Sequence, residues 1–228
     1  MSKSDELKKL FACWVEKHEK YKGKFTADGI ADESVYDEQN PKLLFLCKEE
    51  NNPDQEGRDF RDWFFDSFGQ HDHLRRRICQ WAFGIQNKFP SFETVKEKLP
   101  NDEAKLKVLK SVAFMNLKKI GGDSLAKDEQ IRAAVENEHD LIKEEIEIIN
   151  PDVIIGGIGD HSLWKVIFPG IQFCDPGRAA NETGFDTSVA RAGSHKVISF
   201  YHPSYRVPDA VLYYLLRNVC QGEPFQKL

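Results

Sequence analysis

Polar side chains capable of chemistry follow three of the predicted strands, at the point where each strand ends. One strand runs into the acid- and amide-rich residues 48–53, a second ends at Asn116, and the last runs into His202 of a His-Pro-Ser sequence. Ligands of open α/β sheets bind outside the carboxyl ends of the strands. The sequence therefore predicts one crevice that holds carboxylate, amide and imidazole groups.

This set of groups suits a nucleobase bound together with its sugar. A neutral imidazole can donate to an oxygen of a departing base and so stabilise the developing negative charge. An asparagine amide donates and accepts at once, which matches a Watson–Crick edge. A carboxylate or a second amide near the sugar can position a water and stabilise positive charge. The predicted crevice is therefore suited to cleaving an N-glycosidic bond.

Four near-continuous apolar runs are predicted to be buried parallel strands, because such strands are covered on both faces. They are residues 43–47, 111–116, 152–158 and 195–201. Helical patterns separate them, and this alternation indicates parallel βαβ units. We therefore predict an α/β fold, a three-layer α/β/α sandwich with a central, mostly parallel four-stranded sheet.

Helices are predicted where apolar residues recur at helical spacing. Residues 28–40 have a polar, irregular pattern, and residues 175–194 are predicted to be a loop. No repeat or low-complexity linker divides the chain, so residues 1–228 are predicted to be a single domain with a helical N-terminal segment, 1–40, and a core, 41–228. The predicted helices are residues 4–21, 57–68, 71–87, 91–98, 102–110, 127–149, 160–168 and 208–221.

The composition is that of an ordinary soluble globular protein, with 40% hydrophobic and 30% charged residues. No apolar run approaches the ~18 residues of a membrane span, and the polar start of the chain does not resemble a signal peptide. The predicted location is therefore the cytoplasm, with no membrane partner. The five cysteines are odd in number and lack Cys-x-x-Cys spacing, which predicts reduced core residues and neither a metal nor another cofactor. The net charge of −5 disfavours non-specific coating of nucleic acid.

Several other motifs are interpreted as structural. The arginine run 75–77 is predicted to be a solvated helix face, with a groove lining as the alternative. The glycine-rich residues 156–159 are interpreted as a tight strand-to-helix turn rather than a phosphate cradle. His71 and His73 face different ways on a helix, which disfavours a metal site. Asp160 is predicted to be a helix N-cap rather than part of a hydrolase triad.

The polar strand ends, in their order along the chain, resemble the uracil-DNA glycosylase superfamily. In that family a Gly-x-Asp-Pro or Gly-x-Asn-Pro motif follows the first strand and holds the catalytic water. An Asn that ends the second strand reads the base edge, and a His-Pro-Ser motif follows the last strand. The resemblance consists of short motifs within residues 41–210. It implies an enzyme that flips a base out of DNA and hydrolyses its N-glycosidic bond without a metal or cofactor.

The resemblance assigns His202 as the stabiliser of the leaving group and Asn116 as the reader of the base. The alternatives are a structural imidazole that caps the strand end and a turn-forming Asn. Ser204, Tyr205 and Arg206 fall where the family's minor-groove loop inserts a wedge into DNA, so they are predicted to contact DNA. Ordinary loop packing is the alternative for Tyr205 and Arg206.

The first motif departs from the family pattern, since Cys47 or Lys48 replaces its glycine. The Asn-Pro form of the motif is matched by Asn52 only if two residues are inserted, whereas direct counting places a glutamate at the catalytic position. The water-positioning residue is therefore predicted to be one of Glu49, Glu50, Asn51 and Asn52. Asn51 is also a candidate for binding the base, and a solvated polar loop is the alternative for at least two of the four.

Further residues of the resemblance lie after this motif. Phe64 and Phe65 fall where the family's base-stacking aromatic lies, although most aromatics at helical spacing are core. Asp54 replaces the residue that excludes or admits groups at position 5 of the base, and a polar residue there would admit a bulky or hydroxylated group. Lys118 and Lys119 are the local basic candidates for DNA contact.

Together these assignments predict a monofunctional DNA glycosylase, a monomer whose partner is DNA. Its substrate would be uracil or a modified pyrimidine, including the hypermodified cytosine of phage DNA, so that repair and defence against phage DNA both fit. Two alternatives stay open. One is a catalytically degenerate protein of the same fold that binds nucleic acid or a protein partner, and the other is an α/β hydrolase of a free nucleotide.

Overall fold

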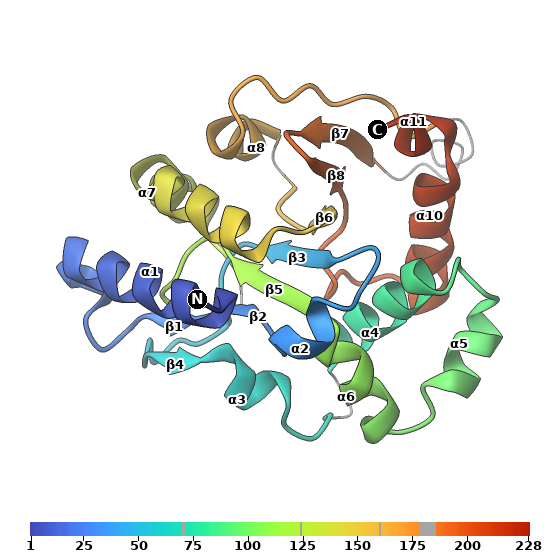
Figure 1. The fold of residues 1–228 in the computed structure, drawn as a ribbon, viewed down its shortest axis with the longest axis horizontal. Helices are drawn as coiled ribbons and strands as arrows, with labels where there is room; N and C mark the ends of the chain where they lie inside the picture. Colours follow the sequence, from blue (N-terminus) through green and yellow to red (C-terminus); the bar gives the residue numbers. More distant parts are fainter. Residues whose placement is uncertain (70–71, 124, 160, 178–185) are drawn as a thin grey trace.

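A mostly parallel sheet forms the centre of the protein (Figure 1). The computed structural model describes residues 1–69, 72–123, 125–159, 161–177 and 186–228. Within these residues the sheet has six strands in the order β2-β5-β3-β6-β8-β7. The parallel strands are β5 (Val112–Asn116), β3 (Leu43–Cys47), β6 (Val153–Gly156) and β8 (His195–Ser199). The antiparallel edges are β2 (Gly29–Ile30) and β7 (Ser188–Ala192).

The strands form because their side chains are buried on both faces of the sheet. Every residue of β3 is buried, and successive residues point to opposite faces. Leu43 and Phe45 belong to one apolar cluster, whereas Leu44 and Leu46 belong to a second. A continuous apolar run is therefore required here, rather than the alternating pattern of a sheet with one wet face.

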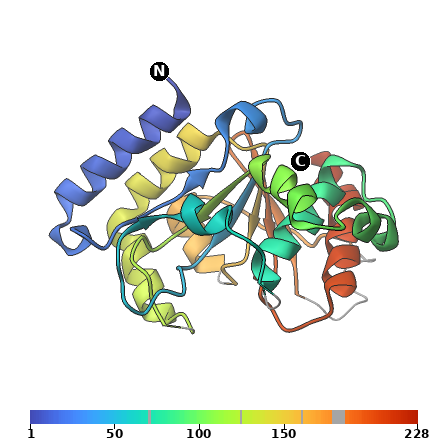
Figure 2. The same cartoon turned by 90° about the horizontal axis from the view of Figure 1, so that it is seen from below.

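Helices cover both faces of the sheet. One cluster packs against α1 (Lys3–Lys17), α7 (Asp128–Ile149) and α8 (His161–Ile167). Figure 2 shows the blue α1 and the yellow α7 side by side on one side of the sheet, with the red α10 on the other side. The helices that pack against the other cluster are α3 (Phe60–Phe64), α4 (His73–Gln86), α5 (Phe92–Lys98), α6 (Asp102–Lys110), α10 (Asp209–Gln221) and α11 (Glu223–Lys227).

The four predicted strands are confirmed as the parallel centre, but the predicted count of four strands for the sheet is wrong. The edge strand β2 lies in the segment 28–40 that was expected to be irregular, and it has only two residues. The other edge strand, β7, lies within the predicted loop 175–194, of which residues 178–185 are outside the described part. Both edges are held by pairing with a neighbouring strand rather than by an apolar pattern of their own.

The predicted helix 57–68 is only partly correct. Its first residues form the short strand β4 (Arg58–Asp59), which pairs in parallel with β1 (Thr26–Ala27). The Asp59 carboxylate accepts from the backbone N–H of Arg61, so α3 begins at Phe60. The predicted helix 4–21 is divided in the same manner, into α1 and a 3₁₀ turn, Glu19–Tyr21.

The remaining short elements were not predicted, and two expected helix starts lie at undescribed residues. A four-residue helix, α2 (Glu33–Tyr36), and the C-terminal α11 were both missed. Asp72, rather than a residue before it, caps α4 by accepting from the backbone N–H of Arg75. His71 and Asp160 lie outside the described residues. In the described part of the chain, no helix combines the length and the apolar character that crossing a bilayer requires.

We expect Gly156→Ala to destabilise the protein strongly. A Cβ at this strand position would overlap the indole ring of Trp164, which is completely buried and has no room to move. Overpacking of this kind costs about 1–3 kcal/mol. Urea denaturation should therefore show a clear loss of unfolding free energy for this variant.

The matched control is Gly69→Ala. Gly69 is exposed, and a Cβ there would meet no atom within 4 Å. This variant should unfold at the same urea concentration as the wild type. Equal midpoints for the two alanine variants would contradict the packing described for β6.

Candidate functional site

The loops that follow β3 and β5 are hydrogen-bonded to each other beyond the strand ends. Leu117 donates to the carbonyl of Cys47 at 3.0 Å, and further along Gly122 donates to the carbonyl of Glu50 at 2.8 Å. The N–H of Asn52 returns a bond to the carbonyl of Gly122 at 3.0 Å. The acid- and amide-rich loop therefore lies beside the segment that begins at the end of β5. We call the ends of β3, β5, β6 and β8, with their following loops, the carboxyl edge.

His202 reaches the carboxyl edge from the loop after β8 and packs against the end of β6. A Cβ on Gly157 would lie 2.7 Å from the Cα of His202, so this close approach requires glycine. The N–H of Gly157 in turn donates to the carbonyl of Leu46 in β3 at 2.8 Å. The predicted tight turn after β6 thus serves to bring His202 next to the middle of the sheet.

The imidazole of His202 is neutral and has a defined tautomer. The backbone N–H of Ser204 donates to Nδ1 at 3.1 Å, so Nδ1 is the acceptor and Nε2 carries the proton. Burial, together with the positive charges of Lys48 and Arg77, lowers the pKa of His202 to about 4. At neutral pH this side chain is therefore a hydrogen-bond donor through Nε2, without a positive charge.

Arg77 holds the loop that carries His202. Its guanidinium donates to the carbonyl of Pro203 at 2.8 Å and to the carbonyls of Tyr205 and Val207, and it pairs with Asp209 at 2.8 Å. The side chain of Arg77 is buried. The loop after β8 is thus fixed by one cation that binds three of its backbone carbonyls.

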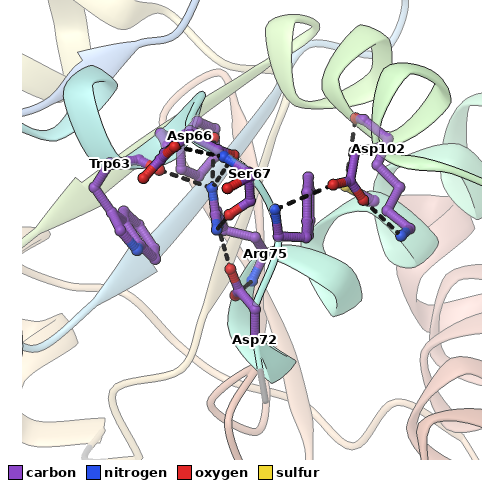
Figure 3. Close-up of polar contacts among 10 residues, drawn as sticks. Trp63, Asp66, Ser67, Asp72, Arg75 and Asp102 are labelled. Carbon is purple, nitrogen blue, oxygen red and sulfur yellow. Dashed lines mark hydrogen bonds and ion pairs between the residues drawn. The ribbon is translucent and has the colours of Figure 1, made fainter. Parts of the chain in front are cut away.

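The prediction of a solvated face for the arginine run 75–77 is wrong, because Arg75 and Arg77 are both buried. Figure 3 shows the guanidinium of Arg75 surrounded by the carbonyls of Trp63, Asp66 and Ser67, at 2.7, 2.8 and 3.0 Å, and paired with Asp72. The segment after α3 has few backbone hydrogen bonds of its own, and Arg75 supplies the missing donors. The arginine run is therefore a set of loop anchors rather than a surface for an anionic ligand.

Asn116 ends β5 with a side-chain oxygen that is not hydrogen-bonded. Its backbone N–H donates to the carboxylate of Asp28 at 2.7 Å. The side chain is buried, yet Oδ1 has no partner among the described residues. Buried polar atoms are normally paired, so an unpaired one at the carboxyl edge indicates a place where a ligand donor would fit. The role of Asn116 in reading a base stays a prediction.

The four candidates for positioning a water differ in their surroundings. Glu49 pairs with Lys118, and Glu50 pairs with Arg58 at 2.7 Å and accepts from Thr26 at 3.2 Å. Both carboxylates thus lie in ion pairs. The remaining two candidates are amides: Asn52 is buried and donates through Nδ2 to the carbonyl of Glu56 at 3.0 Å, whereas Asn51 is exposed.

Two of the predicted site residues are in the wrong place for their roles. Lys119 is completely buried and pairs with Asp28 at 2.5 Å and Glu145 at 2.7 Å, so it is not available to DNA. Phe64 is completely buried against Phe60 and Phe114, so it cannot stack on a base. Both predictions are wrong because these side chains belong to the interior.

The other predicted contacts are at least partly accessible. Phe65 and Lys118 are half-buried, and the latter is already paired with Glu49. Asp54 is exposed on the loop after β3. Exposed residues of the loop after β8 are Ser204, Arg206 and Tyr205, and the last is 47% exposed with its ring 4.8 Å from that of Tyr201.

Three residues that help to build the carboxyl edge were not predicted. Arg77 was grouped with its neighbours, and Asp28 lay in a segment with no recognisable pattern. Lys48 was considered only as a substitute for the motif glycine, but its charge lies near His202 and its Nζ pairs with Asp128 at 2.7 Å. Only contacts between distant segments identify these residues.

No protein-family model matches this sequence, and no curated protein matches it. The geometry of the carboxyl edge is therefore the basis for assigning a function.

The lowered pKa of His202 predicts a specific acid destabilisation. The pKa is about 4 in the folded protein and roughly 6.5 in an unfolded chain. Between these pH values the unfolded state binds one more proton, so the unfolding free energy falls as the pH falls from about 6.5 to 4. The lost stability is at most about 3 kcal/mol.

Urea denaturation of the wild type and of His202→Gln at several pH values between 7 and 4 measures this effect. As the pH is lowered, the wild type should lose more unfolding free energy than the variant does. A difference that stays constant across this range would show that His202 is not held neutral.

Proposed function

We propose that this chain is a monofunctional DNA glycosylase that flips a base out of DNA and hydrolyses its N-glycosidic bond. The observation that carries the proposal is the neutral His202, whose Nε2–H is a hydrogen-bond donor at the carboxyl edge of the sheet. A departing pyrimidine carries negative charge that is shared with its exocyclic oxygens. An uncharged donor that is already oriented stabilises that charge in the transition state.

The proposed reaction breaks the bond between the anomeric carbon and the base nitrogen, and the bonding electron pair leaves with the base. Water then adds to the anomeric carbon and gives up a proton. Glu49 and Glu50 are the carboxylates nearest in sequence to the end of β3, and each lies beside one cation. We propose that one of them positions the water, takes its proton and stabilises the positive charge on the sugar.

Asn116 is proposed to read the base through its amide, whose Oδ1 is buried and has no hydrogen-bond partner among the described residues. The exposed Tyr205, Arg206 and Ser204 lie on the same loop as His202 and are proposed to contact the DNA around the flipped nucleotide. Arg77 would keep this loop in place during flipping, since it binds three of its carbonyls. The substrate is proposed to be uracil or a modified pyrimidine, with the exposed Asp54 facing a group at position 5.

The apolar clusters on the two faces of the sheet support a three-layer α/β/α sandwich as the framework of this site. The free thiols of the chain fit a reducing compartment, and the proposed location is the cytoplasm. The proposed partner is DNA, bound by a monomer.

A second candidate function is a protein of this fold that binds nucleic acid without catalysis. It is favoured by the ion pairs of Glu49 and Glu50, which leave neither carboxylate unpaired. A catalytic protein has to open or share one of these pairs when substrate binds, whereas a binding protein does not.

The test is release of free base from DNA, followed by mass spectrometry. The substrates are DNAs that contain uracil, hypoxanthine, hydroxymethylated cytosine or glucosylated cytosine. The wild type should release a base from at least one of them and leave an abasic site. His202→Ala should lower the rate about 10²–10³-fold, the effect of removing one oriented donor, with DNA affinity changed less than about threefold because base contacts are few beside phosphate contacts.

The matched control is His139→Ala, which removes an imidazole on α7 that is 45% exposed. This variant should release base at the wild-type rate. If the wild type binds DNA but releases no base from any substrate, the glycosylase proposal is wrong and the non-catalytic candidate is favoured.

A further inference from the structure

Three charged side chains lie together next to the end of β5, and all are completely buried. They are Asp28 before β2, Lys119 in the loop after β5, and Glu145 in the last part of α7. We call them the buried triad. Lys119 lies between the two carboxylates, with its Nζ 2.5 Å from Asp28 and 2.7 Å from Glu145.

The buried triad is linked directly to Asn116. Edge strand β2 pairs with β5 through Gly29 and Ile30, opposite Phe114 and Ala113, and the N–H of Ala31 continues this pairing to the carbonyl of Val112 at 3.2 Å. At the end of β5, the carboxylate of Asp28 accepts from the N–H of Asn116 at 2.7 Å. A side chain therefore supplies the acceptor that the backbone of an edge strand supplies elsewhere along β5.

The segment that contains Asp28 also holds the loop after β5 through two contacts with Lys119. Lys119 binds Asp28 through its side chain, and its carbonyl accepts from the N–H of Thr26 at 2.8 Å. The rings of Phe11 and Trp14 lie 5.7 and 5.4 Å from its Nζ, which fixes the ammonium group further. Asn116 and Lys119 thus cannot move independently of Asp28.

Stability alone does not account for such a cluster. Buried ion pairs and triads can often be replaced by apolar side chains without loss of stability, because desolvation offsets their attraction. Burial raises the pKa of Glu145 well above its usual value, although Lys119 opposes the shift. Of the two carboxylates, only that of Asp28 also binds the backbone of β5.

We propose that the buried triad positions Asn116 for base recognition, with Asp28 as the positioning residue and Lys119 and Glu145 holding its carboxylate. The inference rests on the proposed glycosylase function, in which Asn116 reads the flipped base. A charged carboxylate forms a shorter and stronger bond to an N–H than a neutral acceptor does. The bond from Asp28 therefore restrains the backbone of Asn116, and with it the direction of the unpaired Oδ1.

The chain offers a matched control on the same helix. Glu138 of α7 is also buried, and its carboxylate accepts from Nε1 of Trp14 at 3.0 Å and from the hydroxyl of Tyr21. Its cation is Lys20, at 2.5 Å. None of these groups is in the sheet. Glu138→Gln therefore disturbs a buried carboxylate between α1 and α7 without touching β5.

The experiment compares Asp28→Asn, Glu145→Gln and Glu138→Gln. Base release is measured in single turnover on the preferred substrate and on the best competing base, and affinity is measured on uncleaved DNA. Asp28→Asn should lower the rate on the preferred base at least tenfold and reduce discrimination between the two bases. DNA affinity should change less than threefold, since the phosphate contacts are intact.

Glu138→Gln should keep the rate and the discrimination within threefold of the wild type, because its contacts lie between α1 and α7. Glu145→Gln removes one of the two carboxylates that hold Lys119, so its losses should lie between those of Glu138→Gln and Asp28→Asn. If Asp28→Asn loses no more discrimination than Glu138→Gln does, the positioning role is wrong. If Asp28→Asn does not fold, Asp28→Leu combined with Lys119→Met removes both charges together and carries the same expectations.

Nuclear magnetic resonance separates this inference from the proposed function. Hydrogen exchange of the Asn116 backbone amide should be at least tenfold faster in Asp28→Asn than in Glu138→Gln. If the wild type releases no base, the glycosylase function fails while this exchange difference still tests the link to Asp28. An unchanged exchange rate would overturn the positioning role, whatever the activity.

Discussion

The backbone hydrogen bonds of β3 to its two parallel neighbours set the positions of all the groups at the carboxyl edge. Cys47 lies opposite Asn116 in β5, and Leu46 lies opposite Gly156 in β6. Gly156 in turn lies opposite Ser199 of β8. The four strands therefore end level with one another. A shift of one residue in any pairing would turn its side chains to the opposite face of the sheet, and both faces are filled by packed helices.

Charged groups around the carboxyl edge hold its loops in position and keep the imidazole of His202 neutral. Arg77 is buried and binds the loop of His202, while its charge helps to keep that imidazole neutral. Asp28 holds the end of β5 through the backbone of Asn116 and is itself paired with Lys119. Arg77, Lys48 and Lys118 are thus bound to the protein's own carbonyls and carboxylates, whereas Arg206 is exposed. This arrangement and the net charge of −5 disfavour non-specific coating of nucleic acid.

The central strands and most helices were predictable because their patterns reflect complete burial. The run Leu43–Cys47 is apolar throughout, and only a strand covered on both faces requires that. The edge strands β2 and β7 were not predictable, since β2 has only two residues and β7 mixes apolar with polar side chains, and both are held in place by pairing with their neighbours. Glu145 and Arg77 are likewise charged residues on helices whose burial depends on contacts from distant segments.

The position of the candidate site at the strand ends was predictable. The burial of its individual residues was not, because burial depends on contacts between distant segments. His202 and Asn116 follow strands, so their place at the edge comes from the fold class alone. Lys118 and Lys119 are adjacent in sequence, yet one is half-buried beside Glu49 and the other is enclosed in the interior. Nothing in the local sequence distinguishes them. The same holds for Phe64 and Phe65, of which only the first is completely buried.

The most direct test of this account is the protonation state of His202, because the proposed chemistry depends on a neutral donor at Nε2. Nitrogen-15 nuclear magnetic resonance of the imidazole, recorded from pH 8 to pH 3.5, gives both the tautomer and the pKa. We expect a proton on Nε2 at neutral pH and a pKa of about 4. A pKa of roughly 6.5, the value for a solvated histidine, or a proton on Nδ1 would contradict it.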